Sequence, residues 1–262
     1  MKISVEDQMN NEVTLLHLPQ RIVSLVPSQT ELLFDLGLES EIVGITNYCI
    51  HPADKVKYKT RIGGTKNIVI EAIKTLKPDL IIGNKEENQQ ESIENLKKHF
   101  PVWMSDIFCL DDAVDMILTV GVLVGKTSEA ETIASSIQAS FSGLQSVTTQ
   151  FKTAAYFIWR KPYMVAASHT FIDDMLYRAG FQNVFSTWDR YPEITAAQLK
   201  EAQPEYIFLS SEPYPFKEKH ITEFQDICPK ARISVVDGEL FSWYGSRLQH
   251  SAAYFSKLVQ LG

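Results

Sequence analysis

Charged and aromatic residues gather in a few short segments of the chain, and their types suit holding a ligand. Arg160 and Arg247 carry planar guanidinium groups, which pair with carboxylates or phosphates through parallel hydrogen bonds. Glu86 and Glu212 could accept hydrogen bonds or meet a cation. Neighbouring rings could supply flat apolar faces for a large ligand, and they are Tyr48, Trp159, Tyr163, Tyr214, Phe216, Trp243 and Tyr244.

Each of these residues also has a plainer interpretation, which the sequence leaves open. An aromatic residue beside proline in a loop is typical of local packing. Glu86 and Glu87 could open a helix, because acids suit a first turn. His51, which precedes Pro52, is a candidate metal ligand, and a hydrogen-bonded loop histidine is the alternative.

Catalytic templates fit the sequence poorly. GxSxG, HExxH and GxGxxG do not occur. The segment "GVLVGKTSEAE" resembles the end of a phosphate-binding loop, but Val120 stands where that loop requires its first glycine. We therefore reject a nucleotide site there.

Short apolar runs alternate with helix-length amphipathic segments, a pattern that predicts an α/β fold with parallel sheets. In such sheets ligands sit beyond the carboxyl ends of the strands. The loops that follow the predicted strands include "TNYCIHP", "NKEEN", "WRKPYM", "SEPYPF" and "DGELFSWYGSR", which hold most of the residues above. The predicted strands are residues 22–26, 42–45, 80–82, 101–104, 154–159, 206–209 and 233–236.

The two halves of the chain echo each other, which predicts two similar lobes. "KPDLIIGNKEENQQ" and "QPEYIFLSSEPYPF" share one shape: proline, an acid, an apolar run, then glutamate. "SQTELLFDLG" matches a capping box from Ser28 to Glu31 and stops at Gly37. "SHTFIDDMLYRAG" repeats this figure from Thr170 to Gly180.

A helical segment separates the halves. Over residues 127–149 apolar residues recur at steps of three and four, the period of a helix, although Gly143 is a point where it could end. We predict an N-terminal lobe over 1–126, a linking helix over 127–149 and a C-terminal lobe over 150–262.

Composition narrows the class of protein. A net charge of −7 without blocks of like charge argues against nucleic-acid or anionic-membrane partners. Cys49, Cys109 and Cys228 are odd in number and widely spaced, so buried thiols are expected. The N-terminus lacks the features of a secretory signal and no run of 18 apolar residues exists. A cytoplasmic location is therefore expected, or a periplasmic or membrane-tethered one if a leader has been removed.

"RIVSLVPSQTELLFDLGLESEIVGIT" and "IEAIKTLKPDLII" resemble the class III, helical-backbone substrate-binding proteins of ABC importers for vitamin B12, haem and ferric siderophores. "GGTKN", "NKEEN", "SEPYPF" and "FSWYGSRL" resemble motifs of a leaderless subgroup, the helical backbone metal receptors, near the cobalamin-binding branch. The resemblance implies two α/β lobes joined by one rigid helix, with the ligand cleft between the lobes.

The resemblance also assigns roles to particular residues. It implies that Tyr48, His51 and the turn of Gly63 and Gly64 lie on the N-lobe rim, and that Tyr163, Tyr191 and the loop 241–247 face them. Glu71 matches the first of two glutamates that dock on a permease. The second falls at Ala197, with Glu193 and Glu201 as substitutes out of register. Asn84 stands where the vitamin B12 proteins have a tryptophan.

The leading hypothesis is a non-enzymatic, monomeric binding protein for a corrinoid, a haem or a ferric siderophore, without an intrinsic cofactor. Recognition would combine aromatic stacking with Lys85, Arg160, Arg247 and the glutamates, and an ABC permease is a candidate partner. One alternative is an enzyme or chaperone of corrinoid or tetrapyrrole metabolism, in which His51 acts with Glu86 or Glu212. Another is a protein-interaction module that binds no small ligand.

Overall fold

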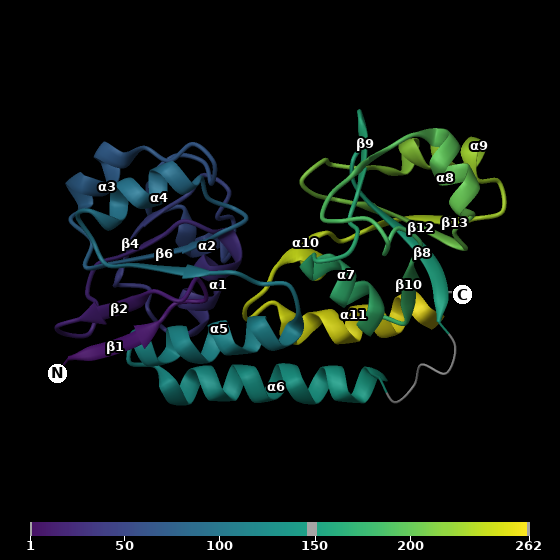
Figure 1. Ribbon diagram of the computed structural model, residues 1–262. Helices are drawn as coiled ribbons and strands as arrows, with labels where there is room; N and C mark the ends of the chain where they lie inside the picture. Colours follow the sequence, from purple (N-terminus) through teal and green to yellow (C-terminus); the bar gives the residue numbers. More distant parts are fainter. Residues whose placement is uncertain (1, 146–150, 261–262) are drawn as a thin grey trace. The chain divides into compact units, whose positions relative to one another are not determined.

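The computed structural model describes residues 2–145 and 151–260 (Figure 1). The chain divides into two compact units. Unit 1 holds the residues up to Asp106, Asp111–Ile137 and Tyr244–Arg247. Unit 2 holds Ile107–Leu110, Gln138–Trp243 and the residues from Leu248 onward. This division differs from the predicted boundaries at 126 and 150, because short segments of each half belong to the other unit.

Unit 1 is built on a five-stranded sheet with the order β5-β4-β3-β6-β7, in which every neighbouring pair is parallel. Its central strand residues are apolar and fully buried, as expected for strands covered on both faces. The strands are β3 (Ile22–Ser24), β4 (Ile42–Ile45), β5 (Thr60–Arg61), β6 (Leu80–Asn84) and β7 (Val102–Ser105). The helices are α1 (Pro27–Asp35), α2 (Ala53–Val56), α3 (Ile70–Leu76), α4 (Gln90–Lys97) and α5 (Leu110–Leu123). An antiparallel hairpin, β1 (Ile3–Glu6) with β2 (Glu12–Leu15), forms a separate sheet.

Unit 2 has a mixed sheet with the order β11-β9-β8-β12-β13, and β10 also pairs with β8. Strands β8, β10, β12 and β13 are parallel, whereas β9 and β11 run antiparallel to their neighbours. The strands are β8 (Lys152–Trp159), β9 (Tyr163–Val165), β10 (Phe181–Asn183), β11 (Glu193–Ile194), β12 (Tyr206–Ser210) and β13 (Arg232–Val236). The helices are α7 (Phe171–Arg178), α8 (Ala196–Ala202), α9 (Ile221–Ile227), α10 (Glu239–Ser242) and α11 (Leu248–Gln260), with a 3₁₀ turn at Glu218–His220.

The predicted strands are present with ends shifted by one or two residues, and the α/β class is confirmed. The short strands β1, β2, β5, β9, β10 and β11 were not predicted, because two to four residues carry too little periodicity. The capping box at Ser28 is wrong: α1 begins at Pro27 after Val26, and Ser28 is buried. Thr170 does cap α7, since its hydroxyl accepts from Asp173 N at 3.2 Å.

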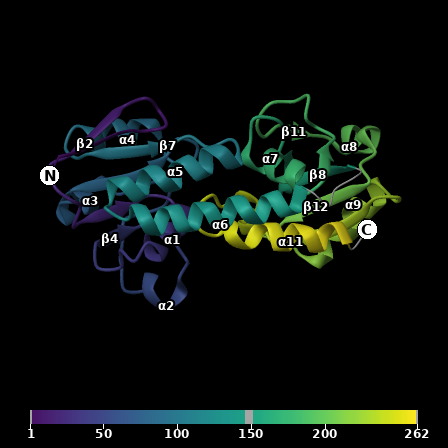
Figure 2. The same ribbon diagram turned by 90° about the horizontal axis from the view of Figure 1, so that it is seen from below.

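Helix α6 (Thr127–Gln145) fills the described part of the predicted segment and continues through Gly143, while residues 146–149 lie outside the described residues. Figures 1 and 2 both draw α6 beside α5. A glycine permits this approach, because a Cβ on Gly121 would lie 2.3 Å from the Cβ of Ala130. This contact packs the first turns of α6 against α5 of unit 1.

Gly121→Ala tests this contact. Adding a methyl group where the helices touch should lower the free energy of unfolding by about 1–3 kcal/mol, the usual cost of overpacking. Gly143→Ala is the matched control, because a Cβ there meets nothing within 4 Å. It should raise helix stability by up to about 1 kcal/mol. Thermal unfolding followed by circular dichroism measures both, and equal shifts would contradict the close packing.

Candidate functional site

In unit 1, the loop after β4 presents an exposed aromatic ring. Tyr48 is 62% exposed, and its ring packs on Gly64, where an added Cβ would lie 3.2 Å from Tyr48 Cε2. Arg61, which the sequence did not single out, braces this loop by donating to the carbonyl oxygens of Thr46 and Cys49 at 2.6 and 2.9 Å. The loop continues to His51, which is half-buried before a cis bond to Pro52.

The loop after β6 is held by two buried asparagines. Asn84 Oδ1 accepts from the backbone N–H groups of Glu86 and Glu87 at 2.8 and 3.0 Å, and Asn84 Nδ2 donates to Ser105 Oγ at 2.9 Å. Asn88 Oδ1 accepts from Asn84 N at 2.9 Å. The glutamates therefore lie in a side-chain-stabilised turn. The alternative that they open a helix is wrong, since α4 begins only at Gln90.

Lys85, in the same turn, is paired with an acid. Its amine donates to the carboxylate of Asp106, and the two side chains are 51% and 17% exposed. The cation expected to meet the ligand is thus already neutralised within unit 1.

Unit 2 contains a three-residue network that the sequence revealed only in part. Arg160 Nε and Nη2 both donate to Glu223 Oε2, at 2.9 and 2.6 Å, and the hydroxyl of Tyr163 donates to Oε1. Burial acts to raise the pKa of Glu223, but the bonds from Arg160 and Tyr163 outweigh it and hold that pKa below its ordinary value. Burial and the bond to Glu223 raise the pKa of Tyr163 to about 12.

Arg247 is also paired with a glutamate, in unit 1. Its Nε and Nη2 donate to Glu31 Oε2 and Oε1 at 2.8 and 2.6 Å, and both side chains are about 85% buried, with exposed fractions of 15% and 16%. In this structure both guanidinium groups therefore bond protein carboxylates, and that either also meets a ligand stays a prediction.

Glu212, after β12, is a buried acceptor for neutral donors. Its Oε1 accepts from Ser242 Oγ at 2.7 Å and from the indole N–H of Trp243 at 2.8 Å. Burial raises the pKa of the Glu212 carboxyl, and these two hydrogen bonds only partly oppose the rise. Trp243 is 7% exposed, so its indole anchors the 242–243 turn instead of offering an open face.

The other predicted rings divide into open and buried groups. Trp159 is 39% exposed, and its ring packs edge-to-face with the half-buried ring of Tyr214, with 5.6 Å between the two ring centroids. Phe216 and Tyr244 are buried, and Phe216 packs on Phe224 in the core of unit 2, which corrects the expectation of open faces there.

Tyr191 comes with a cation that the sequence did not single out. The guanidinium of Arg190 lies over the rings of Tyr191 and Phe108, 5.6 and 5.4 Å from their centroids. Stacked arginine of this kind is a recurrent recognition group. The segment "DRYPE" places an arginine directly before a tyrosine, but such a segment is also typical of an ordinary loop, so the sequence alone does not single out Arg190.

Metal-ligating and docking residues have separate positions. Across residues 2–145 and 151–260, no three His, Cys, Asp or Glu side chains are grouped to hold a metal ion, His51 included.

Glu71 projects from α3 with an 81% exposed side chain that pairs with Lys74. Ala197 lies exposed in the first turn of α8, and Glu193 and Glu201 are also exposed.

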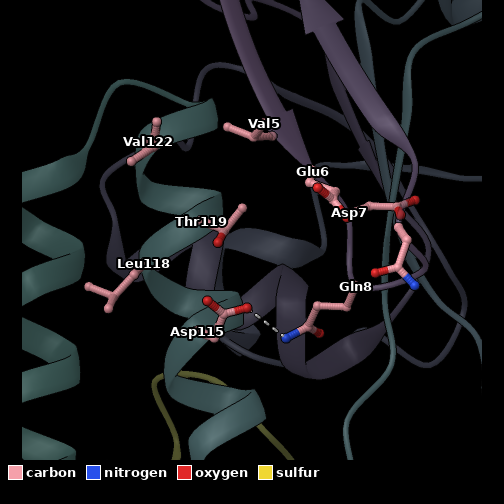
Figure 3. A pocket seen from close by; sticks show the side chains of 9 residues that line it. Val5, Glu6, Asp7, Gln8, Asp115, Leu118, Thr119 and Val122 are labelled. Atoms are coloured by element: carbon pink, nitrogen blue, oxygen red, sulfur yellow. Dashed lines mark hydrogen bonds between the residues drawn. The ribbon is translucent and has the colours of Figure 1, made fainter.

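A further pocket of unit 1 lies away from these loops (Figure 3). It has a volume of about 510 Å³ between the β1–β2 hairpin and α5, where Gln8 Nε2 donates to Asp115 Oδ2 at 3.1 Å. Its lining contains none of the residues predicted to bind the ligand. That the loops of both units contact one ligand stays a prediction.

Glu212→Gln tests the buried carboxyl. Between the ordinary carboxyl pKa and the raised pKa of folded Glu212, the folded protein binds more protons than the unfolded chain, so this group costs stability as pH rises through that window. The neutral amide keeps an acceptor for Trp243 and lacks this cost. The melting temperature of the variant relative to the natural protein should therefore rise as the pH increases from the ordinary carboxyl pKa through the raised pKa of folded Glu212. Glu71→Gln, an exposed carboxylate, is the control, and a difference for Glu212→Gln that does not change with pH would refute the assignment.

Comparison with known proteins identifies the family. Residues 22–227 match the family described as "Periplasmic binding protein". A "Vitamin B12-binding protein" of Pectobacterium carotovorum subsp. carotovorum is 24% identical over 202 residues, which are 75% of this chain and 73% of the relative. An "Uncharacterized ABC transporter substrate-binding lipoprotein" of Bacillus subtilis is 24% identical over 216 residues, 78% of this chain and 68% of that protein.

A solved structure shares the fold. The "Periplasmic heme-binding protein RhuT" of Roseiflexus sp. RS-1, in its apo form, aligns with a TM-score of 0.82 at 20% identity, over 91% of this chain and 97% of that one. Because the family match spans well over half of the chain, this protein belongs to the periplasmic binding protein family.

Proposed function

We propose that this protein binds a metal-containing small molecule, a corrinoid, a haem or a ferric siderophore, through the loops at the carboxyl ends of its parallel strands. Membership of a family of binding proteins makes it a binding protein and not an enzyme. The observation that carries the ligand proposal is the pair of exposed rings, Tyr48 in the loop after β4 of unit 1 and Trp159 at the last residue of β8 in unit 2. Exposed rings at the carboxyl ends of strands suit a flat, largely apolar ligand.

The names of the relatives support this ligand class. The similar proteins from other organisms are named for vitamin B12 and haem, both of which are metal-containing macrocycles. We propose that the metal chemistry belongs to the ligand, with the protein supplying binding and orientation. No described helix has the length and hydropathy to cross a bilayer.

We also propose an ABC permease as the protein partner, with Glu71 as its docking residue. A similar chain is named as an ABC transporter substrate-binding lipoprotein. A carboxylate that is 81% exposed at the start of a helix suits an arginine pocket on a partner. This role requires that the protein face the outer side of the membrane, whereas the cytoplasmic location expected from the sequence would exclude it. Cell fractionation distinguishes the two.

Tyr48→Ala tests the ligand proposal. Loss of one stacking ring should weaken binding of cyanocobinamide, or of whichever metal complex binds, about tenfold, equivalent to about 1.4 kcal/mol. Tyr58→Ala is the matched control, because Tyr58 is 78% exposed and lies outside the predicted loops. Tryptophan fluorescence titration of both variants measures this, and equal affinities would remove Tyr48 from the site.

Glu71→Lys tests the permease proposal. The reversed charge should abolish ligand import in cells that express the protein with its transporter, while ligand affinity in solution stays unchanged, because docking is separate from binding. Glu94→Lys on the neighbouring α4 is the control for an exposed charge reversal. Ala197→Glu should increase import, and import that survives Glu71→Lys would count against docking through this helix.

A further inference from the structure

Residues 63–67 of unit 1, "GGTKN", form a tight turn after β5. Gly64 N donates to the carbonyl oxygen of Asn67 at 3.0 Å, which closes the turn. Gly63 has a φ of +98°, and an added Cβ there would lie 2.4 Å from that same oxygen, so the turn requires glycine. Thr65 and Lys66 lie at its tip.

The base of this turn supports the loop that carries the exposed ring of Tyr48. The carbonyl oxygen of Gly63 accepts from Asn47 N at 2.8 Å. The Tyr48 ring packs on Gly64, where an added Cβ would lie 3.2 Å from Cε2 of the ring. The position of the ring therefore depends on where the glycine turn sits.

The tip of the turn is held by one buried side chain, that of Asn88. Asn88 is 5% exposed, and its Nδ2 donates to the carbonyl oxygens of Thr65 and Leu25 at 3.0 and 3.4 Å. Its Oδ1 accepts from Asn84 N at 2.9 Å. An amide offers donors and an acceptor together, so a single side chain joins the segments after β3, β5 and β6.

A second bond joins the same two turns from the surface. The ammonium group of the exposed Lys66 donates to the carbonyl oxygen of Glu86, in the turn after β6. The glycine turn thus lies between the loop of Tyr48 and the turn of Glu86, and it is bonded to both. Within unit 1, the loops after β4, β5 and β6 form one connected network.

We propose that Asn88 is a positioning residue for the candidate site of unit 1: through Thr65 and the glycine turn, it sets the place of the Tyr48 ring. This rests on the proposed function, and it adds a residue that acts through Tyr48 without meeting the ligand. A ring held in place before binding costs less ordering when the ligand arrives. Loss of Asn88 should therefore weaken binding only while Tyr48 is present.

Hydrogen–deuterium exchange of the ligand-free protein tests the connection itself. Asn88→Leu removes the buried bonds, and Lys66→Met removes the surface bond without touching the core. In both variants the hydrogen-bonded amides of Asn47 and Gly64 should exchange about fivefold faster, the factor expected for loss of one hydrogen bond.

The matched controls are Gln90→Leu and Lys98→Met, which make the same changes at exposed positions of unit 1. Neither should alter the exchange of these two amides. A general loss of stability would instead speed exchange throughout unit 1, including β7 and α4. Circular dichroism verifies that each variant is folded.

A double-mutant cycle tests the role in binding, with dicyanocobinamide and haemin as the probes. For a probe that binds, Asn88→Leu should lower the affinity about fivefold in the natural protein and less than about twofold in the Tyr48→Ala variant, because the ring through which it acts is gone. A merely structural role would lower the affinity by the same factor in both.

Unchanged exchange at Asn47 in both folded variants, or an affinity loss that is equal with and without the Tyr48 ring, overturns this inference and leaves the proposed function standing. If neither probe binds, the proposed function fails for both macrocycles. The exchange measurement needs no ligand, so it still decides whether Asn88 positions the loop of Tyr48.

Discussion

The pairing of each site arginine with a glutamate is the constraint on which the rest of the site depends. A guanidinium that is largely withdrawn from water needs a carboxylate nearby, because an unpaired charge there is expensive. Glu223 meets this need for Arg160 and at the same time orients the hydroxyl of Tyr163. Glu31 meets it for Arg247 and so joins α1 to the turn at 244–247, which is part of unit 1. Both pairs fix the two arginine side chains within their own units.

The fold supplies the positions that these pairs occupy. Parallel strands end at one edge of their sheet, so the loops after β4 and β6 converge in unit 1, and those after β8 and β12 converge in unit 2. Loops of this kind need internal support, since their backbone groups lack a ladder partner. Arg61 supports the loop of Tyr48, and Asn84 with Asn88 supports the turn of Glu86. The exposed ring of Tyr48 is thus carried by a braced loop, whereas that of Trp159 is carried by the last residue of strand β8.

Much of the architecture could be predicted from the sequence, and much of the site could not. Strands such as Leu80–Asn84 could be predicted from the sequence, because buried parallel strands are continuous apolar runs. Short edge strands give no such signal. The partner of Arg247 was not predictable, because Glu31 lies 216 positions away and local spacing pointed to a capping box. Glu223 lies in the ordinary amphipathic helix α9, where no sequence motif marks it as the partner of Arg160. Burial of Phe216 and Trp243 also depends on neighbours distant in the chain, so their residue types suggested open faces that the packing closes.

Hydrogen–deuterium exchange with and without dicyanocobinamide tests the central claim most directly, because it reports which backbone segments a ligand protects. The account predicts slower exchange in residues 46–51 and 84–89 of unit 1 and in residues 159–163 of unit 2, with no change in the β1–β2 hairpin. Protection confined to the hairpin and α5, around the pocket of Asp115, would contradict it.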